Sequence, residues 1–409
     1  MGRAGGISVR RIRLWALLLL VVLPISGCWS RIELNDLGVV LALGLDVGEE
    51  EAVRLTVLIP APSAPGQSGG GGGAGGGGSG AASPVWVAVR EAPSVSDAMQ
   101  MLQQAAPRRL VRHHMRVVLI SEEYARTHGV GDILDALAND LQARMTVRPF
   151  IVEGRAEDLL ENQPPLRPYQ PMHLTGILQA AGGVEWRLKD ILVGRVSETH
   201  STWMHAVKLV TRPAGAPGGF LLGSVISGAA LMRGDSLVRI LHPPESQVFE
   251  WFFGIPKEMI MSAPCPKGEA GTFSGHVLQA KMVTQPLVEG GQVKFRVTVT
   301  VHMNMSRSEC NVEVRRRSDR TRLEEAMAAE LRGQFEKVIA AMQEAGVDPV
   351  GFGKRLQLAY PAYFRGIRDR WSEVWPTAPV EVETKVTIRQ AGLMKAPAIR
   401  TDRELQEWR

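Results

Sequence analysis

Two periods of apolar residues divide the chain into expected strands and helices. The clearest strand is 293–305, where every odd residue is apolar and every even residue is polar. Such alternation predicts a strand of about 44 Å with one buried face. A helical period follows, which we expect to begin at a capping box from Thr321 to Glu324 and to end at Gly346. Its apolar stripe consists of Leu323, Met327, Leu331, Phe335, Ile339 and Met342.

The same patterns predict alternating elements elsewhere in the chain. Asp348 and Pro349 are expected to cap a further helix, and 380–389 alternates again, so the C-terminal order is strand, helix, helix, strand. In the N-terminal half, Pro149 suggests that the strand at 147–152 lies at a sheet edge. Gly234 to Ser236 is expected to turn a hairpin. The other strands expected in that half are 39–45, 53–59, 85–89 and 117–120, and its helices are 96–104 and 133–141.

These elements predict an α+β fold of about three modules, each built on a mixed β-sheet with packed helices. The expected units are an N-terminal α/β domain at 28–203, a small middle α+β domain at 204–270, a C-terminal α+β domain at 271–395 and a polar tail at 396–409. A glycine-rich segment within 62–83 cannot bury apolar surface, so we expect a flexible loop inside the first domain.

The N-terminus has the features of an export signal. Basic residues at 10–13 precede an apolar run, 14–23, that is too short to span a bilayer. Leu23-Pro-Ile-Ser-Gly-Cys28 then resembles a bacterial lipobox, which predicts removal of 1–27 and a diacylglyceryl group on Cys28. Two acyl chains suffice for stable anchoring. The alternatives are an ordinary cleaved signal and an uncleaved anchor, and the lipobox spacing favours lipidation.

Net charge changes meaning once this leader is set aside. The whole chain has a formal charge of +5, but four of its 47 basic residues precede Cys28, which leaves 43 basic against 42 acidic residues. A balance of +1 gives no general electrostatic reason to bind nucleic acid. Basic residues still cluster around His113 and His114, and again at 315–322. A contact with anionic headgroups or an acidic partner is one interpretation of each cluster, and a solvated surface segment is the favoured one.

Three stretches resemble the Ger(x)C family, the C-subunit lipoproteins of bacterial spore nutrient germinant receptors. They are 27–37, which begins Gly-Cys-Trp; 117–124 with 133–152; and a C-terminal series. That series comprises Asp348-Pro-Val-Gly-Phe-Gly353, Tyr360-Pro361, Trp371, Trp375-Pro376 and 386–392.

The resemblance implies a non-enzymatic, lipid-anchored subunit that acts in nutrient-triggered spore germination. Its place would be the outer face of the spore inner membrane, and its partners an A-type subunit and a permease-like B-type subunit. The family has no assigned catalytic residues, so none is carried to this chain.

Candidate chemistry is sparse. None of the nine histidines lies in an HExxH motif, and the P-loop and SxxK patterns are absent from the sequence. We therefore expect no catalytic residue, metal site or cofactor. Cys265 and Cys310 are compatible with a disulfide and with two separate thiols, because spacing does not decide between them. Trp371 and Trp375 suit an aromatic partner-binding face, or more commonly the packing of a helix on a sheet.

Two other classes of function remain open at this point. A lipoprotein that binds a solute for a transporter would have a ligand cleft between two lobes. A surface hydrolase would have a cleft that contains a paired nucleophile and base.

Overall fold

The computed structural model describes most of the chain. The described residues are 33–60, 85–162, 169–180, 182–197, 201–210, 223–255, 259–312 and 316–390, with the single positions 13, 15, 164 and 167. The predicted leader, the glycine-rich segment 62–83 and the tail 396–409 lie outside these residues, apart from positions 13 and 15.

The larger sheet has eight strands in the order β10-β9-β8-β7-β6-β2-β3-β4. Its members are β2 (Ala42–Val47), β3 (Val53–Pro60), β4 (Val85–Ala92), β6 (Val117–Ser121), β7 (Arg148–Glu153), β8 (Ser201–Val210), β9 (Gly223–Arg233) and β10 (Ser236–Leu241). The four central strands β2, β6, β7 and β8 are parallel, and the outer strands pair antiparallel. Continuous apolar runs such as that of β6 are buried on both faces.

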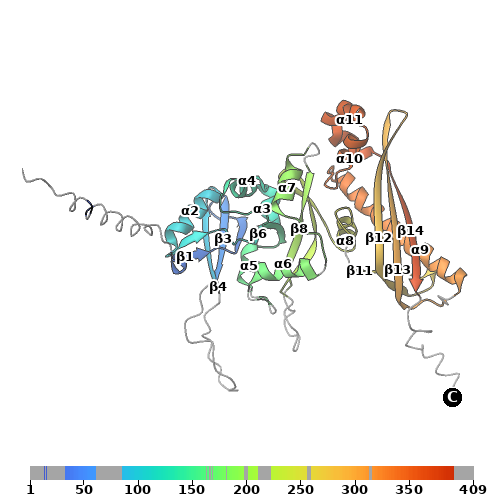
Figure 1. Ribbon diagram of the computed structural model, residues 1–409, viewed down its shortest axis with the longest axis horizontal. Coiled ribbons are helices and arrows are strands. Elements are labelled where there is room, and N and C mark those ends of the chain that lie inside the picture. The colour runs from blue at the N-terminus through green and yellow to red at the C-terminus, as the bar shows by residue number, and fades with distance from the viewer. Residues whose placement is uncertain are drawn as a thin grey trace, which may run out of the picture.

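A small parallel ladder stands beside this sheet at the N-terminal end of the described chain. It joins β1 (Leu37–Val39) to β5 (Arg109–Val111), with Leu37 opposite Arg109. The 3-10 turn η2 (Leu34–Asp36) precedes β1. In Figure 1 this ladder lies at the end of the molecule farthest from the C-terminal sheet.

Helices cover both faces of the eight-stranded sheet (Figure 1). One face carries α2 (Val95–Ala105), α3 (Glu122–Thr127), α4 (Gly131–Asn139) and α7 (Leu188–Arg195). The other face carries α5 (Ala156–Glu161) and α6 (Gln170–Ala180). The expected α/β layering of the N-terminal half is therefore present.

The C-terminal module is a four-stranded sheet in the order β11-β12-β13-β14. Its strands are β11 (Met259–Pro264), β12 (Thr272–Glu289), β13 (Gln292–Ser308) and β14 (Val380–Gln390). Its helical elements are α9 (Arg317–Glu344), α10 (Phe352–Ala359), α11 (Pro361–Ile367), α12 (Trp371–Val374), η3 (Pro266–Gly268), η4 (Arg368–Arg370) and η5 (Trp375–Thr377). Every odd residue from 293 to 305 is buried, which confirms the predicted alternation.

The two sheets share one hydrophobic core. Helix α8 (Glu245–Glu250) lies between them (Figure 1), and its Val248 and Phe249 are buried. Trp203 and Leu231 from the larger sheet belong to the same core cluster as Phe335 of α9. Apolar side chains of each sheet are therefore buried in part by side chains of the other module.

The α+β class with mixed sheets is confirmed, but the larger sheet continues past the predicted end of the first domain. The boundary between residues 203 and 204 falls inside β8, and the β9–β10 hairpin extends the same sheet. Ala230 and Met232 face one core while Ala229 and Leu231 face the other. A hairpin that is apolar on both faces is stable only where other elements cover both faces, so it joins the eight-stranded sheet, which is covered on both sides.

Two local predictions are wrong. The capping box does not form, because α9 begins four residues earlier at Arg317, and the Thr321 hydroxyl donates to the Arg317 carbonyl at 3.0 Å inside the helix. Pro149 does not mark an edge, because β7 lies between β6 and β8. The ladder to β8 begins only at Phe150, so Pro149 lies just outside the residues that pair with β8.

Candidate functional site

A cavity of about 650 Å³ opens where the parallel strands β2, β6 and β7 end. The carboxyl edge of such strands is the usual ligand position in open α/β sheets. Its lining comprises Asp46, Val47, Gly48, Glu49, Ser121, Glu122, Glu123, Arg126, Gly154 and Arg155. Acidic side chains predominate, and no histidine is among these lining residues.

The most buried polar groups of this cavity hold helix starts in place. The Asp46 carboxylate, 3% exposed, accepts the backbone N–H groups of Ala156 at 2.8 Å and Glu157 at 3.0 Å, at the start of α5. Burial raises the pKa of Asp46, and these hydrogen bonds oppose the rise. The Ser121 hydroxyl accepts the N–H of Tyr124 at the start of α3. Neither group is arranged as a nucleophile beside a base.

A second constellation lies where the C-terminal sequence signature meets β8. Both oxygens of buried Asp348 accept backbone N–H groups at the start of α10, from Phe352 and Gly353, each at 2.7 Å. The indole N–H of Trp371 donates to the same carboxylate at 3.3 Å. The N–H of Asp348 in turn donates to the hydroxyl of Ser201 in β8 at 3.1 Å. Asp348 therefore caps the helix, as predicted, and also connects the two modules.

The two tryptophans of the signature are core residues. The indole N–H of Trp375 donates to the Val347 carbonyl at 2.7 Å, and its ring stacks on Phe352 with centroids 4.6 Å apart. Trp371 is equally buried and meets Phe295 of β13 edge to face. They pack helices on the sheet, so the interpretation as an exposed partner-binding face is wrong.

A buried acid–base pair lies between the modules. His205 in β8 donates from Nε2 to the Val184 carbonyl at 2.8 Å, and its Nδ1 lies 3.6 Å from a carboxylate oxygen of Glu250 in α8. Burial lowers the pKa of His205 to about 4 and raises the pKa of Glu250 to about 7. Rings of Trp203 and Phe249 surround the pair. At neutral pH the histidine is therefore neutral, and Glu250 is close to its own midpoint.

Cys265 and Cys310 are joined in a disulfide, with Cα atoms 5.5 Å apart. The bridge connects the residue that follows β11 to the loop that follows β13. Both cysteines are buried. Sequence spacing left two separate thiols as an equal alternative. The fold removes that ambiguity because it brings together residues 45 positions apart.

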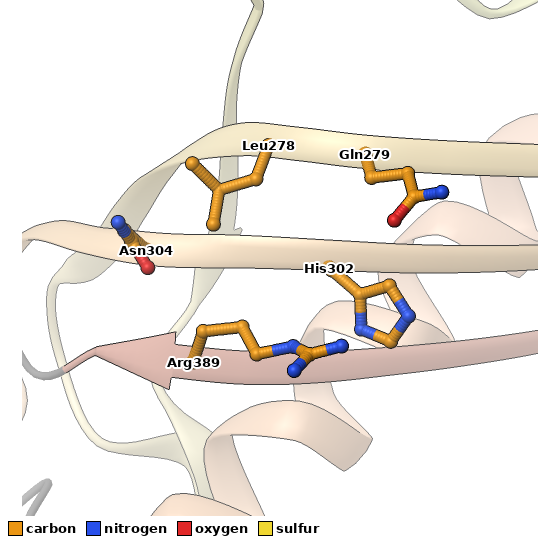
Figure 2. A pocket seen from close by; sticks show the side chains of 5 residues that line it. All are labelled: Leu278, Gln279, His302, Asn304 and Arg389. Carbon is orange, nitrogen blue, oxygen red and sulfur yellow. The ribbon is translucent and has the colours of Figure 1, made fainter.

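The outer face of the C-terminal sheet carries a shallower cavity of about 340 Å³. Figure 2 shows the Arg389 side chain of β14 extending along the sheet toward the ring of His302 in β13. Leu278, Gln279 and Asn304 complete the lining. A register shift in β12 between Val277 and Gln279 leaves Leu278 exposed at its rim.

The remaining sequence predictions concern the anchor, metal sites, membrane spans and the basic clusters. Cys28 lies outside the described residues. No group of three or more His, Cys, Asp or Glu side chains within the described part of the chain is arranged to hold a metal ion. Among the helices of that part, none is both long and apolar enough to cross a bilayer. Arg317 begins α9, and the basic segment around His113 forms the turn between β5 and β6.

Comparisons with known proteins match nearly the whole chain. Residues 30–202 match the family model described as "Spore germination protein N-terminal domain", and residues 227–392 match "Spore germination B3/ GerAC like, C-terminal". The chain belongs to the GerAC/GerKC family of spore germination proteins. This is the C-subunit family of germinant receptors, and it is not known to be enzymatic.

Individual relatives of the GerAC/GerKC family align end to end with this chain. Spore germination protein KC of Bacillus subtilis (strain 168) is 24% identical over 95% of this chain and 98% of its own length. Spore germination protein A3 of the same organism is 22% identical over 90% of this chain and 95% of its own. The crystal structure of the GerBC protein superposes with a TM-score of 0.54 at 19% identity, covering 85% of this chain and 96% of that one. The GerBC-like fold is thus shared.

Proposed function

We propose that the chain is a lipid-anchored, non-enzymatic C subunit of a spore germinant receptor. It would be held at the outer face of the spore inner membrane by Cys28, and would assemble there with an A-type and a permease-like B-type subunit. One observation carries the proposal: both halves of the C-subunit family match in order, and the lipobox-like 23–28 directly precedes them.

The buried chemistry supports a scaffold rather than a catalyst. The side-chain oxygens of Asp46, Ser121 and Asp348 accept hydrogen bonds from backbone N–H groups at helix starts. The connection from Asp348 to Ser201 and the shared core couple the two modules mechanically. Such coupling suits a subunit that transmits contact between partners, because displacement of one module strains the other.

The anchor is tested by metabolic labelling with an alkyne fatty acid in the native host. The wild-type chain should incorporate label, and Cys28→Ala should incorporate none. The matched control is the Cys265→Ala/Cys310→Ala double variant, which should keep the label because its cysteines carry no lipid. Label that persists on Cys28→Ala would refute the anchor.

The receptor role is tested by deletion of the gene in a strain without a paralogue. Nutrient-triggered germination should be lost and should return with a wild-type copy, and a tagged copy should co-purify the A-type and B-type subunits from spore membranes. Intact nutrient germination in the deletion strain would contradict the proposal.

The solute-binding alternative is favoured by one feature, the open cavity at the carboxyl ends of β2, β6 and β7. Arg126 and Arg155 at its rim would suit a nutrient carboxylate. Calorimetry of the isolated protein with candidate nutrients separates the two proposals. Saturable binding that is lost in Arg155→Ala, without any partner subunit, would favour the transporter alternative.

A further inference from the structure

Cationic side chains gather at the amino ends of the parallel strands. Arg109, the first residue of β5, is exposed. The turn from β5 to β6 exposes His113, His114 and Arg116, and the loop from α4 to β7 exposes Arg144. Arg116 lies beside the neighbouring strands, because its N–H donates to the Leu41 carbonyl and its carbonyl accepts the N–H of Arg148. We call the exposed residues Arg109, His113, His114, Arg116, Leu141, Arg144 and Met145 the amino-end patch.

Most carboxylates near this end are paired with other cations: Asp135 and Asp235 pair with Arg195, whereas Asp132 at the start of α4 is exposed. Asp140 is bonded to Arg112, and Glu185 pairs with Arg148. Glu33 and Asp36 precede β1.

The opposite end of the same sheet is acidic. The β2–β3 turn exposes Glu49, Glu50 and Glu51, and the start of α3 exposes Glu123. Three arginines at that end are paired with glutamate: Arg54 with Glu91 and Glu157, Arg126 with Glu122, and Arg155 with Glu157. The near-zero net charge of the body therefore conceals a separation of charge along the strand direction. An anionic surface would attract one end and repel the other.

The amino-end patch also exposes apolar side chains. Leu141 is fully exposed at 100%, and Met145 is exposed at 41%. The chain holds Leu141 there, because its neighbours Asp140 and Gln142 both bond Arg112 of the β5–β6 turn. The N–H of Lys189, another exposed cation, donates to the Met145 carbonyl at 3.2 Å. Apolar tips within a ring of cations match the interface of a bilayer, where acyl chains lie beneath anionic headgroups.

The described chain begins at this end of the molecule. Leu37 in β1 lies opposite Arg109 in the parallel ladder. Leu37 follows Cys28 by nine positions, a length that spans at most about 30 Å when fully extended. A lipid on Cys28 would therefore keep the amino-end patch close to the membrane surface and the acidic end turned away from it.

We propose that the amino-end patch docks on anionic lipid headgroups, with Leu141 and Met145 entering the interfacial layer. The proposal rests on the lipid anchor proposed above. Two acyl chains already suffice for attachment, so the patch sets orientation: it holds the eight-stranded sheet with its amino ends on the membrane. The acidic cavity edge then faces away from the bilayer, where other proteins can reach it.

The test uses the full lipidated chain with Leu141→Cys, labelled with a polarity-sensitive thiol fluorophore. Labelling is selective, because Cys28 carries lipid and Cys265 and Cys310 are bonded to each other. The protein is reconstituted on vesicles of phosphatidylcholine, with or without phosphatidylglycerol. We expect blue-shifted emission, quenched by brominated lipid, only on the anionic vesicles and only at low ionic strength. A label at Glu49→Cys should remain in water on both.

Substitutions test the cations separately from the apolar tip. Arg109→Ala and Arg116→Ala should each lower the ratio of docked to undocked protein about fivefold. The matched control is Arg365→Ala, an exposed arginine on α11 at the other end of the molecule, which should change nothing.

The outcomes separate the patch from the anchor. If the protein sediments with vesicles but the label at 141 stays in water, the patch proposal fails and the anchor stands. If the protein does not sediment with either kind of vesicle, both proposals fail. If the label at 141 becomes shielded only when partner subunits are added, the patch binds an acidic protein face, and the lipid proposal is overturned.

Discussion

Replacement of Asp348 by alanine tests whether one buried carboxylate joins the two modules. Its oxygens accept N–H groups from Phe352, Gly353 and Trp371, and its own N–H reaches Ser201 in β8. Asp348 is 2% exposed, so water cannot replace the lost acceptor without disturbing the corner. The substitution therefore leaves three donors without a partner.

The cost follows from two opposed effects. A buried donor that loses its partner costs about 1–3 kcal/mol, so three donors cost about 6 kcal/mol. Burial also raises the pKa of Asp348 to about 6 from 3.8. At neutral pH that rise corresponds to a net cost of about 3 kcal/mol for keeping the buried carboxylate charged, which the alanine variant no longer bears. The net expectation is a loss of about 3 kcal/mol in the free energy of unfolding.

Denaturant unfolding followed by tryptophan fluorescence measures this loss, because Trp371 and Trp375 lie at the site. Asp348→Asn should have an intermediate effect, since the amide keeps one acceptor oxygen. The control is Asp369→Ala, which removes an exposed carboxylate from the neighbouring turn. The wild-type contribution of Asp348 should fall as pH rises from about 4 to about 6, because the native state then holds a proton that the unfolded chain has lost. An unfolding free energy within error of wild type would refute the reasoning.

Three further predictions concern the core. Between pH 4.5 and 6.5 the native pair holds one proton, on Glu250, and the unfolded pair also holds one, on His205, so the pair makes stability independent of pH in this range. Glu250→Gln removes this balance. Its free energy of unfolding, measured with denaturant, should therefore fall by about 3 kcal/mol as pH falls from 6.5 to 4, because His205 then takes up a proton only in the unfolded state. A flat profile would contradict the lowered pKa of His205. Loss of the 45-residue disulfide loop in Cys265→Ala/Cys310→Ala should cost about 4 kcal/mol. The same shift should appear when wild type is reduced, and reductant should not affect the variant. Leu331→Ala should cost about 2–5 kcal/mol in thermal unfolding, whereas its exposed neighbour Glu325→Ala should cost little; equal effects would refute the assignment of the α9 stripe.

The hydrophobic period of the sequence correctly predicted the elements that bury a single face. The alternation at 293–305 and the stripe of α9 were correct, because burial of one face imposes its period on each element. The start of α9 was wrong for a related reason. The helix begins upstream of Thr321, at Arg317, where Asp319 in the first turn suits the positive end of the helix dipole. Glu324 instead accepts the N–H of Ile388 in β14 at 2.8 Å.

The candidate sites were predictable only in part. The sequence marked Asp348 as a helix cap, since an Asp-Pro pair before a helix has that local meaning. Its contact with Ser201, 147 residues away, has no local signature. The pairing of His205 with Glu250 was missed for the same reason, although an isolated acid and histidine within aromatic-rich segments could have drawn attention to both.

By itself the sequence determined most of the periodic elements, and it predicted an export leader with a lipobox-like end and a net charge near zero for the body. Only the tertiary structure decided that the larger sheet continues through β8 to β10, because strand neighbours are chosen by burial on both faces rather than by proximity in the chain. It also decided where the charges lie. A sum over residues cannot distinguish a mixed surface from a separated one. The fold places the exposed cations Arg109, Arg116 and Arg144 at one end of the sheet, and exposed glutamates with paired arginines at the other.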